Sequence, residues 1–325
     1  MVISGNECDS QRKGRSNGER GKAERTHSGH TLGNELPGSK LQTTRVPRLD
    51  PLANFAVYAR AGDSYSAPMN ATSLCRRGFV FGLLALACTA TAADRLSIPD
   101  YYECPRATGP IKIDGRADEP AWAKALVIDS FVAFWAARPA KTKTKARLLW
   151  DDEHLYFHAE MEDADLYADV RETNGHIWEN DVFELFFKPS DTSLAYYEFQ
   201  INPLNAQFHT FLPSRGAGGM RRAISSPDDG KFALKTAVFL QGTLNNWRDT
   251  DKGWSVEGRI PWKDFNRTGG APKTGDVWRF ALCRYDYSKH FESPDLSSCA
   301  PLTAPNYHRY EDYCRLKFLG ATNSR

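Results

Sequence analysis

Short segments in which apolar and polar residues alternate are the feature that most restricts the fold of this chain. Residues 155–161 and 254–260 both follow the pattern, and turn-forming residues bound them. Successive side chains of a strand point to opposite faces, so the pattern is typical of half-buried strands in antiparallel sheets. No stretch from residue 94 onward sustains the period of 3.6 residues that an amphipathic helix requires.

The recurring pattern predicts one all-β domain, an antiparallel β-sandwich or jelly roll of about nine or ten strands with short helical turns. Pro120 is well placed to begin one such turn, and Trp122 is expected to anchor the core. The expected strands lie at 111–115, 141–150, 155–161, 182–188, 196–202, 205–211, 232–240, 254–261, 276–286 and 314–318.

The first 93 residues differ in composition from the rest. Residues 1–68 are polar, rich in Gly, Ser and Arg, and predict a disordered extension upstream of the true start at Met69. Residues 69–93 contain two arginines, the apolar run 79–87 and small residues at the end, which is the pattern of a signal peptide. The apolar run is about half of the ~20 residues that a spanning helix needs. We therefore expect export, periplasmic or extracellular, without a transmembrane span, and a domain at 94–325.

The route of export has alternatives. Arg76 and Arg77 resemble a twin-arginine signal, although paired arginines also occur in ordinary signals. The sequence 85–88 resembles a lipoprotein cleavage box, so a lipid anchor at Cys88 is one alternative to cleavage near Ala92 or Ala93.

Charge and cysteine content narrow the choice of partner and compartment. The chain has 42 basic and 40 acidic residues, of which the first 93 residues carry 12 and 7, which leaves 30 and 33. This nearly neutral remainder argues against nucleic acid as a partner. In an oxidising compartment, four cysteines allow two disulfides in three pairings, although buried free thiols are an alternative. They are Cys104, Cys283, Cys299 and Cys314.

Residues 176–188 form the strongest candidate for a binding site. A polar, aromatic turn leads into an apolar strand in which Glu184 shares one face with Val182 and Phe186. Trp178 precedes the acid by six residues and provides a flat apolar ring near the carboxylate. A ring and a carboxylate are the minimum set of groups for holding a sugar. The alternatives are an ion pair of Glu184 with Arg279 or Arg284 and a Trp178 that only covers the sheet edge.

An ordered set of motifs gives the chain a resemblance to a known family. The motifs lie at 113–122, 154–157, 178–184, 197–202, 253–257, 260–262 and 306–313. In this order they resemble family 9 carbohydrate-binding modules and their bacterial relatives across essentially all of the chain from residue 94. The resemblance implies a β-sandwich that grips the end of a sugar chain between two aromatic rings.

The resemblance also implies ligand-binding residues. Trp178 matches the first ring, and Glu184 matches the acid that accepts hydrogen bonds from sugar hydroxyls. Gln200 stands where the family often has Arg, with Asn202 two residues further on the same face. Tyr307 aligns roughly with the second ring, where well-known members have Trp. His308 is a further candidate, with a hydrogen bond within the turn as its alternative role.

Catalysis has little support in the sequence. Glycoside hydrolysis needs two carboxyl groups around a cleft, and the chain contains no recognisable pair, no G-x-S-x-G and no H-E-x-x-H. We therefore expect a non-enzymatic protein with a carbohydrate ligand, which could act beside a glycoside hydrolase. No cofactor is expected.

Two other site chemistries remain as alternatives. Residues 162–165 with Asp169 could supply oxygen ligands for structural calcium, although a solvated acidic turn is the favoured interpretation. A haem-binding electron-transfer domain of a related sandwich fold would need Met and His ligands. Met161, Met220, His158 and His209 are available, but Met161 and His158 are predicted on opposite faces of one strand.

Overall fold

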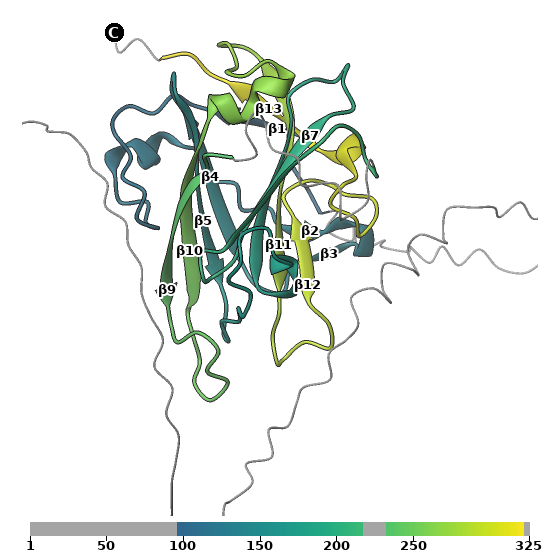
Figure 1. Ribbon diagram of the computed structural model, residues 1–325. Coiled ribbons are helices and arrows are strands. Elements are labelled where there is room, and N and C mark those ends of the chain that lie inside the picture. Colours follow the sequence, from purple (N-terminus) through teal and green to yellow (C-terminus); the bar gives the residue numbers. More distant parts are fainter. Residues whose placement is uncertain (1–95, 217–231, 322–325) are drawn as a thin grey trace, which may run out of the picture. The chain divides into compact units, whose positions relative to one another are not determined.

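The computed structural model describes residues 96–216 and 232–321, which form strands and short 3-10 helices (Figure 1). The extension expected at 1–68 and the signal peptide expected at 69–93 lie outside the described residues. Within those ranges, no helix is long and apolar enough to cross a membrane. The strands are β1 (Tyr101–Cys104), β2 (Val132–Ala133), β3 (Arg138–Pro139), β4 (Thr144–Trp150), β5 (His154–Glu162), β6 (Val182–Lys188), β7 (Tyr196–Ile201), β8 (Gln207–Leu212), β9 (Lys235–Gln241), β10 (Gly253–Pro261), β11 (Val277–Asp286), β12 (Asp295–Ser298) and β13 (Cys314–Phe318).

The strands form two sheets, which confirms the predicted β-sandwich. The first has nine strands, in the order β3-β2-β12-β11-β6-β7-β8, and β13 joins it by pairing with β11 and β1. The second has four strands in the order β4-β5-β10-β9. Among these strands only β1 and β13 pair in parallel. The 3-10 helices are η1 (Pro120–Lys124), η2 (Phe134–Ala136), η3 (Ile177–Glu179), η4 (Trp262–Thr268) and η5 (Tyr310–Asp312).

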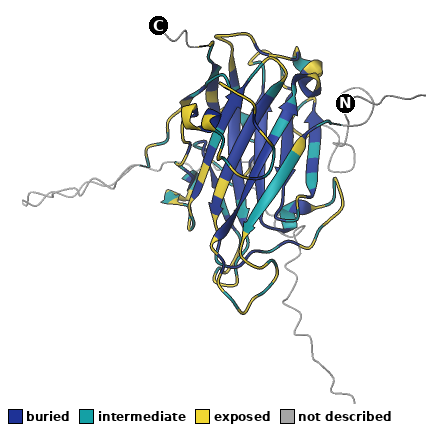
Figure 2. Ribbon diagram, turned by 90° about the vertical axis from the view of Figure 1, so that its left-hand side faces the viewer, coloured by how far each residue is buried: buried dark blue, intermediate teal, exposed yellow. Residues whose placement is uncertain are grey.

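The hydrophobic core lies between the two sheets. Phe183, Leu185 and Phe187 of β6 point into it, and the Phe187 ring lies 6.0 Å from that of Phe265 on η4. Val256 of β10 enters the same core from the four-stranded sheet. Figure 2 shows strands that are buried along most of their length and exposed residues that gather in the loops. The alternation in the sequence therefore identified the core-facing side of these strands.

A segment before β2 covers the outer face of the four-stranded sheet. Trp122 of η1 is 2% exposed, as expected of a core anchor, and its Nε1 donates to the Glu257 carboxylate at 3.0 Å. The backbone N–H groups of Asp114 and Gly115 donate to the same carboxylate at 2.8 and 3.1 Å. The strand expected at 111–115 was therefore wrong, because its donors bind a buried side chain and not a neighbouring strand.

The predicted disulfides are absent from the structure. Cys104, Cys283, Cys299 and Cys314 are all buried and unpaired. The thiol of Cys283 donates to the Ser298 hydroxyl at 3.5 Å, and that of Cys314 donates to the Cys299 carbonyl at 3.6 Å. Burial favours the neutral thiol and raises the pKa of each of the four. The cysteines therefore act here as small apolar residues of the core.

Candidate functional site

Three polar side chains lie next to one another on the outer face of the nine-stranded sheet. Glu184 of β6 pairs with Gln200 of β7, and Phe186 pairs with Glu198 on the same two strands. Residues directly opposite one another in an antiparallel pair share a face, so all four side chains point outward. Glu184, Gln200 and Glu198 are nevertheless only 2%, 3% and 5% exposed. A buried polar cluster therefore lies where the sequence placed Glu184 and Gln200.

The hydrogen-bonding groups of this cluster are incompletely satisfied. Gln200 Nε2 donates to Glu198 Oε1 at 2.5 Å, but Gln200 Oε1 is buried without a partner. Within residues 96–216 and 232–321, nothing donates a hydrogen bond to the Glu184 carboxylate. Burial, assisted by the charge of Glu198, raises the pKa of Glu184 well above its usual range. Buried polar atoms normally have partners, so this cluster can accept hydrogen bonds from a ligand.

Neither of the ion pairs considered for Glu184 forms. Arg284 reaches Asp163 and Asp286 at 3.2 and 3.4 Å, on the other side of the sheet. Arg279 pairs with Asp191 at 2.6 Å. The two arginines are therefore engaged elsewhere, and Glu184 keeps its carboxylate available.

Trp178 lies beside this cluster on the same face. It sits on η3, where Ile177 is fully buried and fixes the turn. The Trp178 ring meets the Phe208 ring edge-on at 5.4 Å, and Phe208 is the register partner of Gln200 on β8. One face of Trp178 carries the exposed His176 ring, stacked at 4.6 Å and 23°. Trp178 and Tyr285 of β11 both pack against the apolar cluster that includes Phe208.

Tyr307 does not offer the open stacking face that the resemblance implies. It is 4% exposed, and its hydroxyl donates to the backbone oxygens of Arg284 at 2.6 Å and Ser297 at 3.1 Å. Its ring packs against Tyr285 at 5.2 Å. In this position Tyr307 fastens the segment between β12 and β13 to the outer face of the sheet. The Tyr307 ring is smaller than that of Trp, and it is covered on this face.

His308 and Asn202 have defined contacts as well. His308 Nδ1 lies 2.9 Å from the Tyr196 hydroxyl, and its charge lowers the pKa of Glu198 against the larger raising effect of burial. His308 therefore borders the polar cluster. Asn202 is different, because its amide donates to Val170 and Asn180 and its oxygen accepts from Leu204 and Ala206. These four bonds hold the turn between β7 and β8 and leave no group of Asn202 for a ligand.

Sequence reasoning missed three residues around the cluster. Glu198 lies two residues before Gln200 on β7, so the period of two could have placed both side chains on the same face. Tyr285 pairs with Val182 across β11 and β6. Tyr287, just beyond β11, donates its hydroxyl to the Trp178 backbone oxygen at 2.8 Å. The last two positions depend on strand pairing, which the sequence pattern did not specify.

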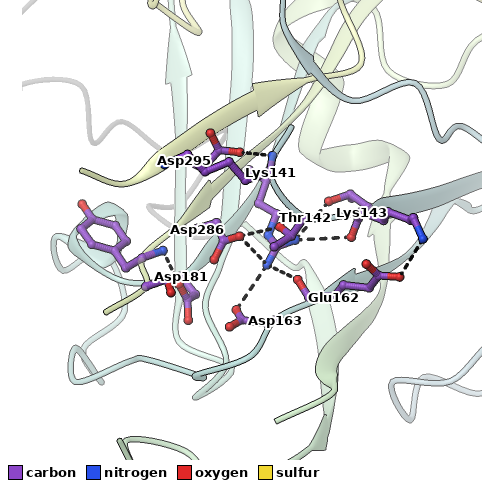
Figure 3. A network of polar contacts seen from close by, with 12 residues as sticks. Lys141, Thr142, Lys143, Glu162, Asp163, Asp181, Asp286 and Asp295 are labelled. Atoms are coloured by element: carbon purple, nitrogen blue, oxygen red, sulfur yellow. Dashed lines mark hydrogen bonds and ion pairs between the residues drawn. The ribbon is translucent and has the colours of Figure 1, made fainter. Parts of the chain in front are cut away.

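A second polar cluster lies at the end of the sandwich near the start of β6 (Figure 3). Carboxylate oxygens of Asp163, Asp181 and Asp286 lie within 4.8 Å of one another, and all three residues are buried. The Arg284 guanidinium lies 3.2 Å from Asp163 and 3.4 Å from Asp286, and Thr142 donates to Asp286 at 2.5 Å. Burial raises the pKa of Asp163 to about 6, and it also raises the pKa of Asp181 and Asp286.

This acidic cluster has the donor set of a hard-cation site. Three carboxylates against one guanidinium leave excess negative charge in a buried place, and carboxylate oxygens are the ligands that Ca²⁺ prefers. Of the acids expected to bind calcium, only Asp163 belongs to it. Asp169 accepts from the Asn180 amide at 2.8 Å, and Glu162 pairs with Lys143 at 3.5 Å. Asp181 and Asp286 complete the cluster from distant parts of the sequence.

The residues considered for haem are not gathered. His158 and Met161 point to opposite faces of β5, with His158 beside Trp122 at 5.9 Å and Met161 in the core. His209 lies on β8 in the other sheet, where its Nδ1 contacts Asn174 at 2.8 Å. Met220 lies outside the described residues.

Comparison with known proteins identifies a family and several relatives. Residues 113–313 match the family described as carbohydrate family 9 binding domain-like. Endo-1,4-beta-xylanase A of Thermotoga maritima is 30% identical over 161 residues, which cover 48% of this chain and 12% of the xylanase. Exoglucanase XynX of Acetivibrio thermocellus is 25% identical over 167 residues, which cover 47% and 14%. The chain thus spans only a small part of the length of these curated relatives.

Solved structures share the architecture. A candidate carbohydrate-binding protein from Bacteroides uniformis matches with a TM-score of 0.53 at 18% identity, over 68% of this chain and all of that chain. A carbohydrate-binding module of family 9 from Caldicellulosiruptor kristjanssonii, in complex with cellotriose, matches with a TM-score of 0.47 at 18% identity, over 69% and 95%. The first of these likenesses agrees with the β-sandwich described above.

Proposed function

Because this chain belongs to the carbohydrate family 9 binding domain-like family, a family of binding and not catalytic domains, we propose that it is an exported protein that grips the end of a polysaccharide or oligosaccharide. The ligand would lie on the outer face of the nine-stranded sheet. Trp178 would carry the apolar face of a sugar ring, and Glu184 would accept hydrogen bonds from its hydroxyls. The protein would hold the sugar without cleaving it.

The observation that carries this proposal is the unsatisfied polar cluster beside a partly exposed indole ring. Glu184 lacks a donor among the described residues, and Gln200 Oε1 is buried without a partner. Trp178 is linked to them through Phe208, which pairs with Gln200. A pyranose provides both missing elements, since its C–H face packs on an aromatic ring and its rim donates hydrogen bonds.

The surroundings of Glu184 support binding by hydroxyl donors in particular. Because burial raises the pKa of Glu184, ionisation of this carboxyl is unfavourable in the free protein. Hydrogen bonds donated to a carboxylate favour the charged form. Charge-assisted bonds of this kind are stronger than bonds between neutral groups. Tyr285 lies near Glu184, offers a partly exposed ring and takes the place proposed for the second ring. Sites of this type bind with about −4 to −8 kcal/mol.

Calorimetric titration with xylo-, cello- and manno-oligosaccharides tests the proposal. We expect saturable heat with at least one series, and we expect Trp178→Ala to abolish it while Trp178→Phe retains part of it. Tyr101→Ala serves as a matched control, because Tyr101 is a partly exposed aromatic residue of β1. No heat with any sugar would overturn the proposed function. Binding that survives Trp178→Ala would move the site elsewhere.

Export and association with a hydrolase extend the proposal. The pattern at 69–93 supports export, with a lipid at Cys88 as the alternative to plain cleavage. N-terminal sequencing of the exported protein should give a start close to Asp94, and a start at Cys88 would indicate the lipoprotein. The matched segments of the two glycoside hydrolases support a role beside such an enzyme.

A further inference from the structure

Three aromatic rings lie next to one another beyond Trp178, at the end of the sandwich. The Tyr287 hydroxyl binds the Trp178 backbone oxygen at 2.8 Å, and the Tyr287 ring lies 6.1 Å from that of Tyr167. The Tyr167 ring lies 5.7 Å from that of Trp247, at an interplanar angle of 35°. We call these four residues the aromatic row. Trp178 and Tyr167 come from the β5–β6 loop, Trp247 from the β9–β10 loop and Tyr287 from the β11–β12 loop. The last two loops lie at the lower end of Figure 1.

The two tyrosines of the aromatic row are fixed by one buried carboxylate. Asp181 accepts the backbone N–H of Tyr167 at 2.6 Å and that of Tyr287 at 2.7 Å, with one oxygen for each. Asp181 itself is fully buried at the start of β6. The relative position of the β5–β6 and β11–β12 loops is therefore set before any ligand arrives.

Hydrogen bonds of the loop around Trp247, and not burial of its ring, fix the position of this residue. Asn245 exchanges three hydrogen bonds with Leu166 and Ala168, and Lys289 Nζ donates to the Trp247 backbone oxygen at 2.8 Å. The Trp247 side chain is nevertheless 44% exposed, so it contributes little to the core. A large exposed ring on an ordered loop is the arrangement of a contact residue, since binding then requires little loss of conformational freedom.

We propose that Tyr287, Tyr167 and Trp247 of the aromatic row form a second sugar subsite, which takes further rings of the same glycan chain whose end lies at Trp178 and Glu184. This inference rests on the proposed function, and it adds that the ligand is a chain of several sugar units and not a single unit. Successive stacking platforms suit a glycan with flat apolar C–H faces. Polar groups flank the rings, since Asp169 lies beside Tyr167 and Lys289 lies beside Trp247.

The composition of the aromatic row favours a glycan over a protein partner. Other exposed large apolar side chains of the described residues include aliphatic ones, namely Leu126, Val127, Leu194 and Val277. None of these four lies in the loops that carry the aromatic row, although protein interfaces bury aliphatic as well as aromatic groups. The hydrogen bond from the Tyr287 hydroxyl to the Trp178 backbone places the row next to the terminal subsite.

The test compares a disaccharide with a hexasaccharide of whichever series the protein binds, by calorimetry on the purified protein and its variants. We expect the wild type to bind the hexasaccharide more tightly. Trp247→Ala should weaken hexasaccharide binding roughly two- to tenfold and leave disaccharide binding unchanged, as expected for loss of one aromatic contact. Trp247→Phe should retain part of the difference. Val277→Ala removes an exposed side chain of similar accessibility at the start of β11 and should change neither affinity.

The possible outcomes separate this inference from the proposed function. Equal affinity for the two lengths, or a Trp247→Ala variant that binds the hexasaccharide as tightly as the wild type, would overturn the second subsite and leave the function standing. Equal weakening of both lengths would also overturn it, because Trp247 would then contact the terminal unit. No binding of either sugar by the wild type would overturn the function and the subsite together. Thermal melting of each variant verifies that the fold is retained.

Discussion

Two properties of Glu184 lower the stability of the folded protein. This residue is buried, and no described residue donates a hydrogen bond to it. Ionising a carboxyl in such a place is expensive, which is why its pKa is raised. A neutral side chain of the same shape would suit the free protein better. Retaining an acid there is consistent with a role in binding, in which the ligand provides the missing donors.

Replacement of Glu184 by Gln should therefore stabilise the protein and remove sugar binding. Below the unfolded-state pKa, near 4.5, both states hold the proton. Above it the unfolded state ionises while the folded state still holds the proton, so the unfolding free energy falls as pH rises, by up to ~1.4 kcal/mol per pH unit. Denaturant unfolding between pH 4 and pH 9 should show a smaller fall in Glu184→Gln than in the wild type.

An exposed acid elsewhere in the chain provides the control for this prediction. Asp191 is exposed and paired with Arg279, which lowers its pKa, so Asp191→Asn should not reduce the fall of stability with rising pH. Glu198 remains in the Glu184→Gln variant with its own raised pKa, so part of the fall should persist. An unchanged pH profile in Glu184→Gln would contradict the assignment of the raised pKa to this residue.

At the scale of elements, regular alternation predicted the long strands well. The strands expected at 155–161, 254–261 and 276–286 correspond to β5, β10 and β11. Short strands near one edge of the nine-stranded sheet were missed, among them β2 and β12, because two to four residues are too few to show a period. The sequence also could not reveal that η1 covers the polar face of β5, which buries Tyr156 and His158.

The residues of the candidate site also divide into those that local sequence patterns placed and those that only long-range contacts bring together. Trp178, Glu184 and Gln200 come together because each belongs to an element that the sequence pattern located. The burial of Tyr307 could not be predicted from the sequence, because it depends on contacts of a long irregular segment with β11 and β12. The acidic cluster joins Asp163, Asp181 and Asp286, which only the pairing of the sheets brings together.

The ends of β5, β6 and β11 meet at this acidic cluster, and we expect Ca²⁺ to stabilise them. A cation held by Asp163, Asp181 and Asp286 would offset excess negative charge and raise the stability of the folded state by mass action. The midpoint of thermal unfolding should be higher in millimolar Ca²⁺ than in EDTA at pH 7.5. Asp286→Asn should remove this difference, whereas Asp191→Asn should preserve it. Equal midpoints in Ca²⁺ and EDTA for the wild type would contradict a cation site.

At the scale of the whole molecule, the sandwich is stabilised by its core and not by covalent links. A domain of more than 200 residues can bury enough apolar surface to fold without disulfides, unlike small secreted domains. The described core extends from Tyr102 of β1 to Phe318 of β13 and includes buried rings of both sheets. Four thiols lie within this structure without pairing.

Thiol accessibility in a protein that spans Asp94–Arg325 tests this arrangement. Its four cysteines are buried and their pKa values are raised, so the folded protein should react with almost no thiol reagent at pH 8. In denaturant without reductant, all four should react, and their release should follow the cooperative loss of the sandwich, since no thiol is exposed before the core opens. Two or fewer reactive thiols in denaturant would show a disulfide and would contradict the finding that all four cysteines are unpaired. Reaction of Cys283 in the folded protein would instead show that the segment between β12 and β13, whose Tyr307 lies near Cys283, opens independently of the sheets.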